Sequence, residues 1–297
     1  MGFSNVYGVA GWAKSGTANL IDGKAIAAAS RAETAAAVAA LTAAGAPAPA
    51  LATILVGEDP ASEVYVGAKH KACAEAGMRS IDHRLTADCS AVELRELIVA
   101  LNADPEVTGI LLQLPLPAGL DPATFVDLID PRKDVDGLST ASVGALWRSR
   151  PGLVPCTPAG VLELLEHSGA QLEGASAVVV GRSELVGRPI AAMLLAADAT
   201  VTIRHRHSRD LEATCRSADV LVVAPGRAKM IGPEHVKPGA VVIDVGITRT
   251  EDGLVGDVDY DAVAPIAGAI TPVPGGVGPM TIARLLCNTL RAAELQV

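Results

Sequence analysis

The stretch AVVVGRSELVGRP, residues 177–189, decides how this chain folds. It begins with apolar, mostly β-branched residues that run into Gly181 and a polar turn, a pattern typical of a buried parallel strand that ends in a loop. Gly187, Pro189 and the apolar run 190–197 then predict a helix, because proline is tolerated in a first helical turn. A glycine-containing turn at a helix N-terminus presents free backbone N–H groups, which favour a phosphate.

This turn matches the dinucleotide-binding fingerprint G-x-G-x-x-G imperfectly. Gly181 takes the first position, but Ser183 and Val186 stand at the second and third, and Gly187 comes one residue late. From the turn alone, a tight strand-to-helix connection that binds no ligand is an equally good interpretation.

The next strand is expected over 200–203, and the residues after it are Arg204, His205 and Arg206. An NAD-binding fold places an Asp or Glu there for the ribose 2′-hydroxyl, whereas guanidinium groups pair with a 2′-phosphate. The two motifs together predict a Rossmann domain that binds NADP through Arg204 and Arg206, and a solvated basic patch is the alternative. His205 and His207 are expected to be exposed neighbours of the cofactor without a catalytic role.

Length and composition exclude several classes of protein. With 297 residues, 50% of them hydrophobic, the chain can bury a large core and is expected to form two domains. A net charge of −9 and 2% aromatic residues argue against a nucleic-acid partner. We find no apolar run of about eighteen residues and no signal-peptide pattern, so neither a membrane partner nor export is expected. The 5 cysteines form no C-x-x-C pair, which argues against a disulfide framework or a zinc site and indicates the cytoplasm.

Strand and helix patterns alternate up to residue 137. Strands are expected over 51–56, 81–85 and 109–114, and helices over 20–44, 60–77 and 91–102. The second and third of these helices begin with typical N-terminal residues. These are Asp59 and Pro60 for the helix over 60–77, and Ser90 and Glu93 for the helix over 91–102. Alternation of this kind predicts an open parallel sheet that binds ligands at the carboxyl ends of its strands.

Three polar side chains fall at or just beyond those carboxyl ends: Lys69, Gln113 and Asp136. Tyr65 precedes Lys69 by one helical turn and therefore shares its helix face. Singly, each has a simpler interpretation: a surface lysine beside a core tyrosine, a polar residue of an edge strand, and a solvated turn over 133–136. Together they predict a common cleft.

Proline-rich segments separate the two predicted domains. Residues 151–155 are expected to be a linker, and Thr157 with Pro158 to cap the helix after it. Strands over 220–223 and 240–245 then extend the second α/β domain.

Segment 271–279 is too rich in Pro and Gly for a regular element. It is either a rigid connector or a loop whose Gly275 and Gly276 let a ligand approach the backbone closely. A helix over 280–293 follows it.

Six motifs of this chain resemble the bifunctional methylenetetrahydrofolate dehydrogenase/cyclohydrolase family, in the family's order and over nearly the whole length. They are VGEDPASEVYVGAK (56–69), GILLQLPLP (109–117), KDVDG (133–137), PCTPAG (155–160), VVVGRSELVGRP (178–189) and TPVPGGVGPMT (271–281). The resemblance implies an α/β catalytic domain with an open parallel sheet over 1–154 plus the C-terminal helix 280–297, a Rossmann domain over 155–279, and a homodimer.

The resemblance also implies an enzyme of one-carbon metabolism, which serves purine and amino-acid biosynthesis. NADP-dependent oxidation of 5,10-methylenetetrahydrofolate gives the methenyl cation, and hydrolysis in the same cleft gives 10-formyltetrahydrofolate. Carried over by motif, Lys69 is catalytic, Gln113 is its hydrogen-bond partner, Tyr65 stacks on the folate and Asp136 holds the pterin.

The remaining motif positions correspond to the cofactor and to a loop on the folate side. The residues carried over to the cofactor are Gly181, Arg182, Ser183 and Ile247, and those carried over to the loop are Pro272 and Gly276. The chain departs from the family where Arg204, His205 and Arg206 stand in place of the usual Cys-His-Ser, so the family's serine contact to the cofactor is in question. The ligase domain of trifunctional relatives is missing, and formate activation is not expected.

Two alternatives to the bifunctional enzyme remain at this point. The first is a Rossmann sensor that binds a cofactor without turnover, which has no reason to bring Lys69, Gln113 and Asp136 together. The second is a dehydrogenase without cyclohydrolase activity, which one spectrophotometric assay separates from the bifunctional enzyme.

Overall fold

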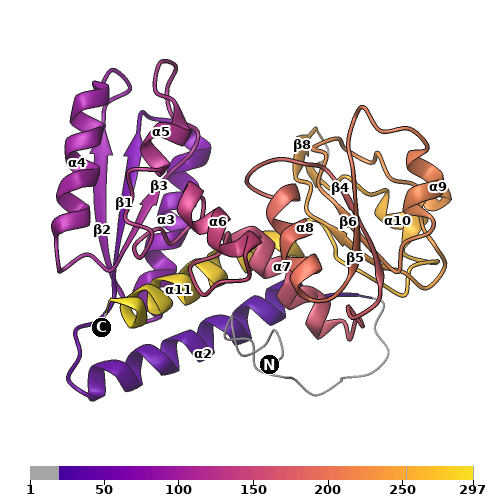
Figure 1. Cartoon of the computed structure of the whole chain (residues 1–297), viewed down its shortest axis with the longest axis horizontal. Coiled ribbons are helices and arrows are strands. Elements are labelled where there is room, and N and C mark those ends of the chain that lie inside the picture. The colour runs from indigo at the N-terminus through magenta and orange to yellow at the C-terminus, as the bar shows by residue number, and fades with distance from the viewer. Residues whose placement is uncertain (1–19, 252, 297) are drawn as a thin grey trace. The chain divides into compact units, whose positions relative to one another are not determined.

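The computed structural model describes residues 20–251 and 253–296, so the part of the predicted catalytic domain over 1–19 lies outside the described residues. The described chain forms two compact units (Figure 1). One contains residues 28–156 and 282–296, and the other contains residues 20–27 and 157–281. No helix in these described ranges is long and apolar enough to cross a membrane.

The unit of residues 28–156 and 282–296 is built on a parallel sheet with the strand order β2-β1-β3. Its strands are β1 (Ala50–Val56), β2 (Arg79–Leu85) and β3 (Gly109–Leu112). The central strand β1 is buried along its whole length, as expected for a strand with a neighbour on each side and a cover on each face. The open parallel sheet predicted from the alternation is therefore confirmed.

Local side-chain chemistry starts the helices that connect these strands. Asp59 accepts a hydrogen bond from the backbone N–H of Ser62 at 2.8 Å and begins α3 (Pro60–Glu75). Ser90 accepts one from the N–H of Glu93 at 3.1 Å and begins α4 (Ala91–Ala103). Each cap satisfies a backbone donor that the first helical turn leaves without a partner, so both predicted N-caps are confirmed.

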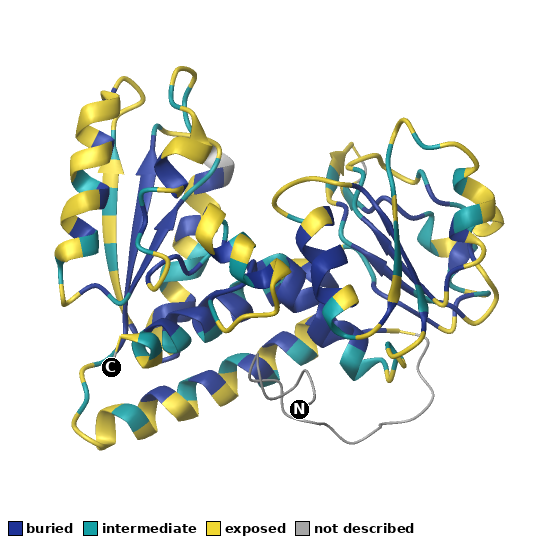
Figure 2. Ribbon diagram, in the orientation of Figure 1, coloured by how far each residue is buried: buried dark blue, intermediate teal, exposed yellow. Residues whose placement is uncertain are grey.

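Helices cover both faces of this sheet. Leu51 and Leu111 pack on one face against Leu285 and Leu286 of α11 (Val277–Leu295). Ile54, Ile110 and Leu112 pack on the other face with apolar residues of α4. In Figure 2 the strands β1 and β3 are accordingly buried between exposed outer helix faces. The other helices of the unit are α2 (Gly23–Ala43), which also enters the second unit, α5 (Pro122–Val126) and α6 (Thr140–Trp147).

Two predicted helix starts are wrong by a few residues. Helix α11 begins at Val277, so Gly278 and Pro279, which were assigned to an irregular loop, lie in its first turn. Helix α7 (Cys156–His167) likewise begins before Thr157 and Pro158, which were expected to cap it. The reason is the same in both cases: a proline in a first helical turn removes an N–H that has no partner there.

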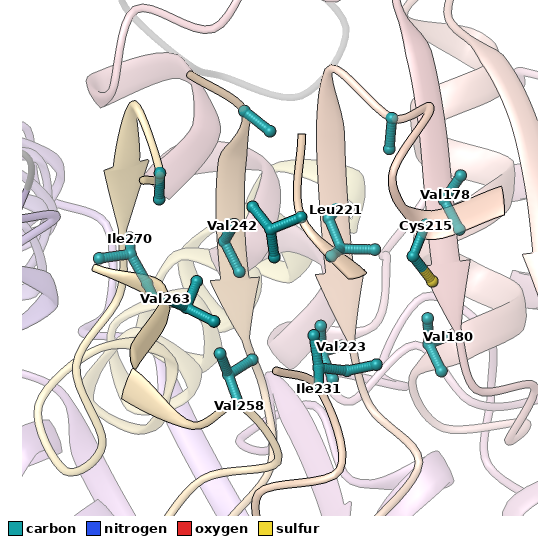
Figure 3. Close-up of a cluster of buried hydrophobic side chains, with 14 residues drawn as sticks. Val178, Val180, Cys215, Leu221, Val223, Ile231, Val242, Val258, Val263 and Ile270 are labelled. Carbon is teal, nitrogen blue, oxygen red and sulfur yellow. The ribbon is translucent and has the colours of Figure 1, made fainter. Parts of the chain in front are cut away.

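The unit of residues 20–27 and 157–281 contains a five-stranded parallel sheet with the order β10-β7-β6-β4-β5. Its strands are β4 (Ser176–Val180), β5 (Thr200–Arg204), β6 (Val220–Val223), β7 (Val241–Asp244) and β10 (Ala269–Ile270). Figure 3 shows one buried face of this sheet, where Val178, Leu221, Val242 and Ile270 of four different strands pack together. The apolar β-branched runs of the sequence form these buried strands.

Strand order places a ligand site in this second sheet. The chain passes from β4 outward to β5 and then returns to β6 on the other side of β4. Such a reversal opens a crevice at the carboxyl end of β4, and ligands of doubly wound sheets bind there. The shorter elements of the unit are α8 (Gly187–Ala196), α9 (Leu211–Cys215), η1 (Pro233–His235), β8 (Thr248–Thr250), β9 (Gly253–Val255) and α10 (Tyr260–Val263).

Candidate active site

Lys69 and Gln113 meet at the carboxyl end of the three-stranded sheet. Lys69 lies on α3, which follows β1, and Gln113 comes directly after β3. Lys69 Nζ donates a hydrogen bond to Gln113 Oε1 at 2.8 Å. Gln113 Nε2 donates to the carbonyl of Leu114 at 2.6 Å, which holds the amide with its oxygen toward the lysine. These two residues, predicted to share one site, are therefore in direct contact.

Tyr65 lies one turn before Lys69 on α3, and its side chain is open to solvent. It is 53% exposed, whereas Lys69 is partly buried. The simpler interpretation, a surface lysine beside a core tyrosine, is therefore wrong. An exposed aromatic ring beside a partly buried amine leaves a flat apolar surface available to a planar ligand.

Asp136 belongs to a segment that its neighbours hold firmly in place. Lys133, 5% exposed, donates through Nζ to the carbonyls of Leu101 at 3.1 Å and Asp104 at 2.7 Å, at the C-terminal end of α4. Asp134, 1% exposed, accepts hydrogen bonds from residues at the start of α6, Ser139 N at 2.8 Å and Ser142 Oγ at 2.7 Å. The interpretation as a solvated turn is therefore wrong, because Lys133 and Asp134 are buried and hydrogen-bonded to α4 and to the start of α6. Asp136 follows them, and its charge acts on Lys69.

Burial and opposite charge act against each other at Lys69 and Asp136. Burial lowers the pKa of Lys69, and the carboxylate of Asp136 opposes this shift. Burial raises the pKa of Asp136, the charge of Lys69 opposes that shift, and Asp134 adds to it. A lysine whose pKa falls toward neutrality can act as a base, which an exposed lysine cannot.

Cys156 and Asn288 lie at the same site, although neither is among the residues predicted for it. Burial, and next the carboxylate of Asp136, raise the pKa of the Cys156 thiol well above its ordinary value, so the thiol is neutral. Cys156 Sγ donates to the carbonyl of Val135 at 3.3 Å. Asn288, on α11, donates to that same carbonyl at 2.8 Å. For Cys156 the available signal is its place in the PCTPAG motif, whereas no local pattern of the sequence distinguishes Asn288.

The turn after β4 has the tight geometry that its glycines predicted. Gly181 has a φ of +127°, and a Cβ there would lie 2.4 Å from the carbonyl oxygen of Ala224, which directly follows the neighbouring strand β6. A Cβ on Gly187 would lie 2.4 Å from the carbonyl oxygen of Gly181. Ser183 Oγ accepts hydrogen bonds from Val186 N at 3.2 Å and Gly187 N at 3.3 Å, at the start of α8. The turn between strand and helix is therefore as close as predicted, but the N–H groups of Val186 and Gly187 are not free as the sequence predicted, because Ser183 Oγ accepts from both.

Basic side chains gather at the carboxyl ends of β4 and β5. Partial burial, and next the charge of Arg182, lower the pKa of His205, and Arg204 contributes in the same direction. Arg204 ends β5 and donates through one guanidinium N–H to Thr214 Oγ1 of α9, while its Nε is buried without a hydrogen-bond partner. Arg206 is exposed and donates from Nε to His207 Nε2 at 3.0 Å. The positive charge needed for a 2′-phosphate is therefore present, and Arg204 is already oriented by α9.

The predicted site residues divide between the two units. Tyr65, Lys69, Gln113 and Asp136 lie in the unit of residues 28–156 and 282–296, and Gly181, Arg182, Ser183, Arg204, Arg206, Ile247, Pro272 and Gly276 lie in the other. Ile247 is 50% exposed just after β7. A Cβ on Gly276 would lie 2.7 Å from the carbonyl oxygen of Pro272, so the loop's own backbone fills the space that this glycine leaves.

No metal centre is built into the part of the chain that the structure describes. Within it, no group of three or more His, Cys, Asp or Glu side chains is placed to hold a metal ion.

Known proteins resemble this chain over both units. The family model for the tetrahydrofolate dehydrogenase/cyclohydrolase catalytic domain matches residues 21–136, and that for the NAD(P)-binding domain matches residues 155–297. Bifunctional protein FolD 2 of Frankia alni is 60% identical over 278 residues, which cover 94% of this chain and 96% of that protein.

Solved structures agree with these matches. The bifunctional FolD methylenetetrahydrofolate dehydrogenase/cyclohydrolase from Campylobacter jejuni has a TM-score of 0.91 and 45% identity, and the match covers 94% of this chain and 99% of that one. The Trypanosoma brucei N5,N10-methylenetetrahydrofolate dehydrogenase-cyclohydrolase, solved with NADP and an inhibitor, has a TM-score of 0.88 and 39% identity over 93% of this chain and 97% of its own.

Proposed function

The chain belongs to the tetrahydrofolate dehydrogenase/cyclohydrolase family, as its six motifs predicted, and we propose that Lys69, Gln113 and Asp136 carry the chemistry of its two reactions. The enzyme oxidises 5,10-methylenetetrahydrofolate with NADP to the methenyl compound and hydrolyses that compound to 10-formyltetrahydrofolate. The observation that carries the proposal is the 2.8 Å contact between Lys69 Nζ and Gln113 Oε1, with Asp136 as the opposing charge.

Oxidation requires the folate to be positioned rather than deprotonated. NADP, when bound, would supply the hydride acceptor, and the residues of the Lys69 site would bind and orient the folate. Tyr65 offers its exposed ring for stacking on the folate, and the carboxyl of Asp136 is suited to accept N–H groups of the pterin. Both side chains therefore act by binding and orientation in this step.

Hydrolysis requires a base, and Lys69 is suited to that role. Water must lose a proton as its oxygen bonds to the methenyl carbon. Burial lowers the pKa of Lys69, and a cationic methenyl group nearby would lower it further. A neutral amine that donates an N–H to Gln113 Oε1 keeps its lone pair available for the proton of water. The adduct then opens to the formyl product when a ring nitrogen takes up a proton and its bond to the carbon breaks.

The fit of the cofactor rests on the turn after β4. Gly181 and Gly187 leave no room for a Cβ, so the end of β4, its turn and the start of α8 pack closely, as in a dinucleotide-binding turn. We assign Gly181, Arg182 and Ser183 to the pyrophosphate side and Ile247 to a further cofactor contact. Arg204 and Arg206 are assigned to the 2′-phosphate, supported by the convergence of basic groups around His205: Arg182, Arg204 and His207. Pro272 and Gly276 keep their assignment to a loop on the folate side.

One assay tests the proposal against its two alternatives. Methylenetetrahydrofolate is mixed with NADP or with NAD, and the reduced cofactor and the methenyl absorbance are followed together. A bifunctional enzyme forms reduced cofactor while the methenyl compound rises only transiently. A cofactor sensor forms neither product, and a dehydrogenase without cyclohydrolase activity accumulates the methenyl compound at the full rate of oxidation. Either of these results would overturn the proposal.

We propose in addition a homodimer formed through the edge strand β5. This strand has a partner on one side only, so its other edge presents unpaired backbone N–H and C=O groups. Ile203 on β5 and Leu195 at the end of α8 are 37% and 54% exposed, which gives the edge an apolar border. Sedimentation equilibrium tests the dimer, because it should return twice the 30.2 kDa mass of the chain.

The cytoplasm is the proposed location, with a role in supplying purine and amino-acid biosynthesis. Cys73, Cys89, Cys156 and Cys215 are free and buried, and Cys287 is free and partly buried. Free thiols suit a reducing compartment, where disulfides do not persist. Fractionation of cells that produce the protein, with an antibody to it, tests the location.

A further inference from the structure

Asn288 connects two segments of chain that flank the Lys69 site. The residue lies on α11, is 4% exposed, and donates through Nδ2 to the carbonyl of Val135 and to the carbonyl of Val154, both at 2.8 Å. The sulfur of Cys156 lies 3.5 Å from the same nitrogen. The two N–H groups of one amide thus match two buried carbonyl oxygens.

Each of these carbonyls stands next to a residue of the site. Val135 immediately precedes Asp136, and Val154 is followed after one proline by Cys156. The two segments also touch directly, because a Cβ on Gly137 would lie 2.4 Å from the carbonyl carbon of Val154. A shift in either segment therefore moves the carboxyl of Asp136 relative to the amine of Lys69, with which it interacts.

The position of the Lys69 amine does not depend on a contact with Asn288. Lys69 is oriented by Gln113, whose own amide is tied to the carbonyl of Leu114. The other end of the Asp136 segment is tied by Lys133 to the end of α4. Asn288 thus connects α11 to the backbone beside Asp136. A side chain without its two donors would leave the carbonyl of Val135 with the Cys156 thiol, a weaker donor, and would take this donor from the carbonyl of Val154.

We propose that Asn288 is a positioning residue that places the carboxyl of Asp136 for folate binding. The inference rests on the proposed role of Asp136 toward the pterin. Asn288 touches no substrate itself; it acts through the carbonyl of Val135. A small displacement of the Asp136 carboxyl should raise the KM for the folate substrate. The KM for NADP should not change, because the residues assigned to the cofactor lie in the other unit.

Asn288→Leu tests the proposal, because leucine is close to asparagine in volume but has no hydrogen-bond donor. The matched control is Thr289→Val, the adjacent buried residue of α11, whose hydroxyl donates to the carbonyl of Leu285 in its own helix at 2.8 Å. Asp136→Asn is measured in parallel and reports on the proposed function alone. Asn288→Ser, which keeps one short donor, decides the question if the leucine variant does not fold.

The readout is the KM for methylenetetrahydrofolate against the KM for NADP, with kcat corrected for folded protein. Asn288→Leu should raise the folate KM about tenfold or more and leave the NADP KM unchanged, because a misplacement of about 1 Å near a site costs up to about 10²-fold. Thr289→Val should leave both values unchanged. The proposal is overturned if a folded Asn288 variant keeps its folate KM within about twofold of the unmodified enzyme, or if both KM values rise alike, as a loss of packing alone would produce. A normal folate KM in Asp136→Asn overturns the role of Asp136 instead.

Discussion

Lys69→Met should stop hydrolysis of the methenyl compound while leaving NADP-dependent oxidation measurable. Methionine has nearly the length and volume of the lysine stem, but it removes the Nζ that donates to Gln113 Oε1 at 2.8 Å. The oxidation transfers a hydride and needs no proton acceptor, whereas the attacking water must lose a proton. The two activities should therefore separate in this variant.

The size of the separation follows from the contacts of Lys69. A positioned general base contributes about 10²–10⁴-fold, so hydrolysis should fall by that factor while oxidation changes far less. Leaving Gln113 Oε1 without its donor costs about 1–3 kcal/mol, which a domain of this size can tolerate. The pKa of Asp136, which burial raises and Lys69 holds down, should rise further in the variant.

The assay follows the methenyl absorbance after methylenetetrahydrofolate and NADP are mixed, in a buffer that does not itself catalyse hydrolysis. The unmodified enzyme should show little methenyl compound, and Lys69→Met should accumulate it. Lys71→Met is the matched control, because Lys71 lies on the same helix, is exposed and pairs with the exposed Glu75 at 3.9 Å, away from Gln113. If Lys69→Met converts methenyl to 10-formyl compound at near the unmodified rate, Lys69 is not the base, and water or another group must take the proton.

Three further predictions concern the Rossmann unit. Changing Arg204 and Arg206 together to Ser should weaken NADP far more than NAD, because each charge-assisted contact contributes about 1.5–3 kcal/mol, and equal losses of kcat/KM with both cofactors would contradict the assignment. Gly187→Ala should lower the free energy of unfolding by about 1–3 kcal/mol and raise the KM for NADP, since its Cβ would lie 2.4 Å from the carbonyl oxygen of Gly181; an unchanged melting temperature would contradict this. Burial raises the pKa of Asp244 to about 6 from 3.8, so the folded state holds this proton more tightly than the unfolded state. Its contribution to stability should be complete below about pH 4 and lost as pH rises through 6, a change of roughly 3 kcal/mol that urea unfolding of Asp244→Asn should not show.

Local chemistry explains what could be predicted from the sequence. The run of residues 177–180 is apolar on both faces and ends at Gly181, which is typical of a buried strand followed by a turn. Strand β4 and its turn have this structure. Asp59 and Ser90 begin helices because their side chains satisfy donors three residues away. Helix α11 begins earlier than its sequence predicts because Pro279 would break a helix in its interior but is tolerated in its first turn.

The tertiary structure alone decided how distant residues meet. Sequence reasoning placed Lys69 and Gln113 at the same edge of a sheet, but their hydrogen bond spans 44 residues and depends on β1 and β3 being neighbours. Asn288 reaches the carbonyl of Val135 across 153 residues, and no local pattern distinguishes it from an ordinary buried amide on an apolar helix face. Helix caps and turns involve residues that are close in the chain, so short sequence motifs are enough to predict them. The contacts that orient Asp136 and Lys69 form only when separate elements pack, because packing, and not spacing along the chain, sets which donor meets which acceptor.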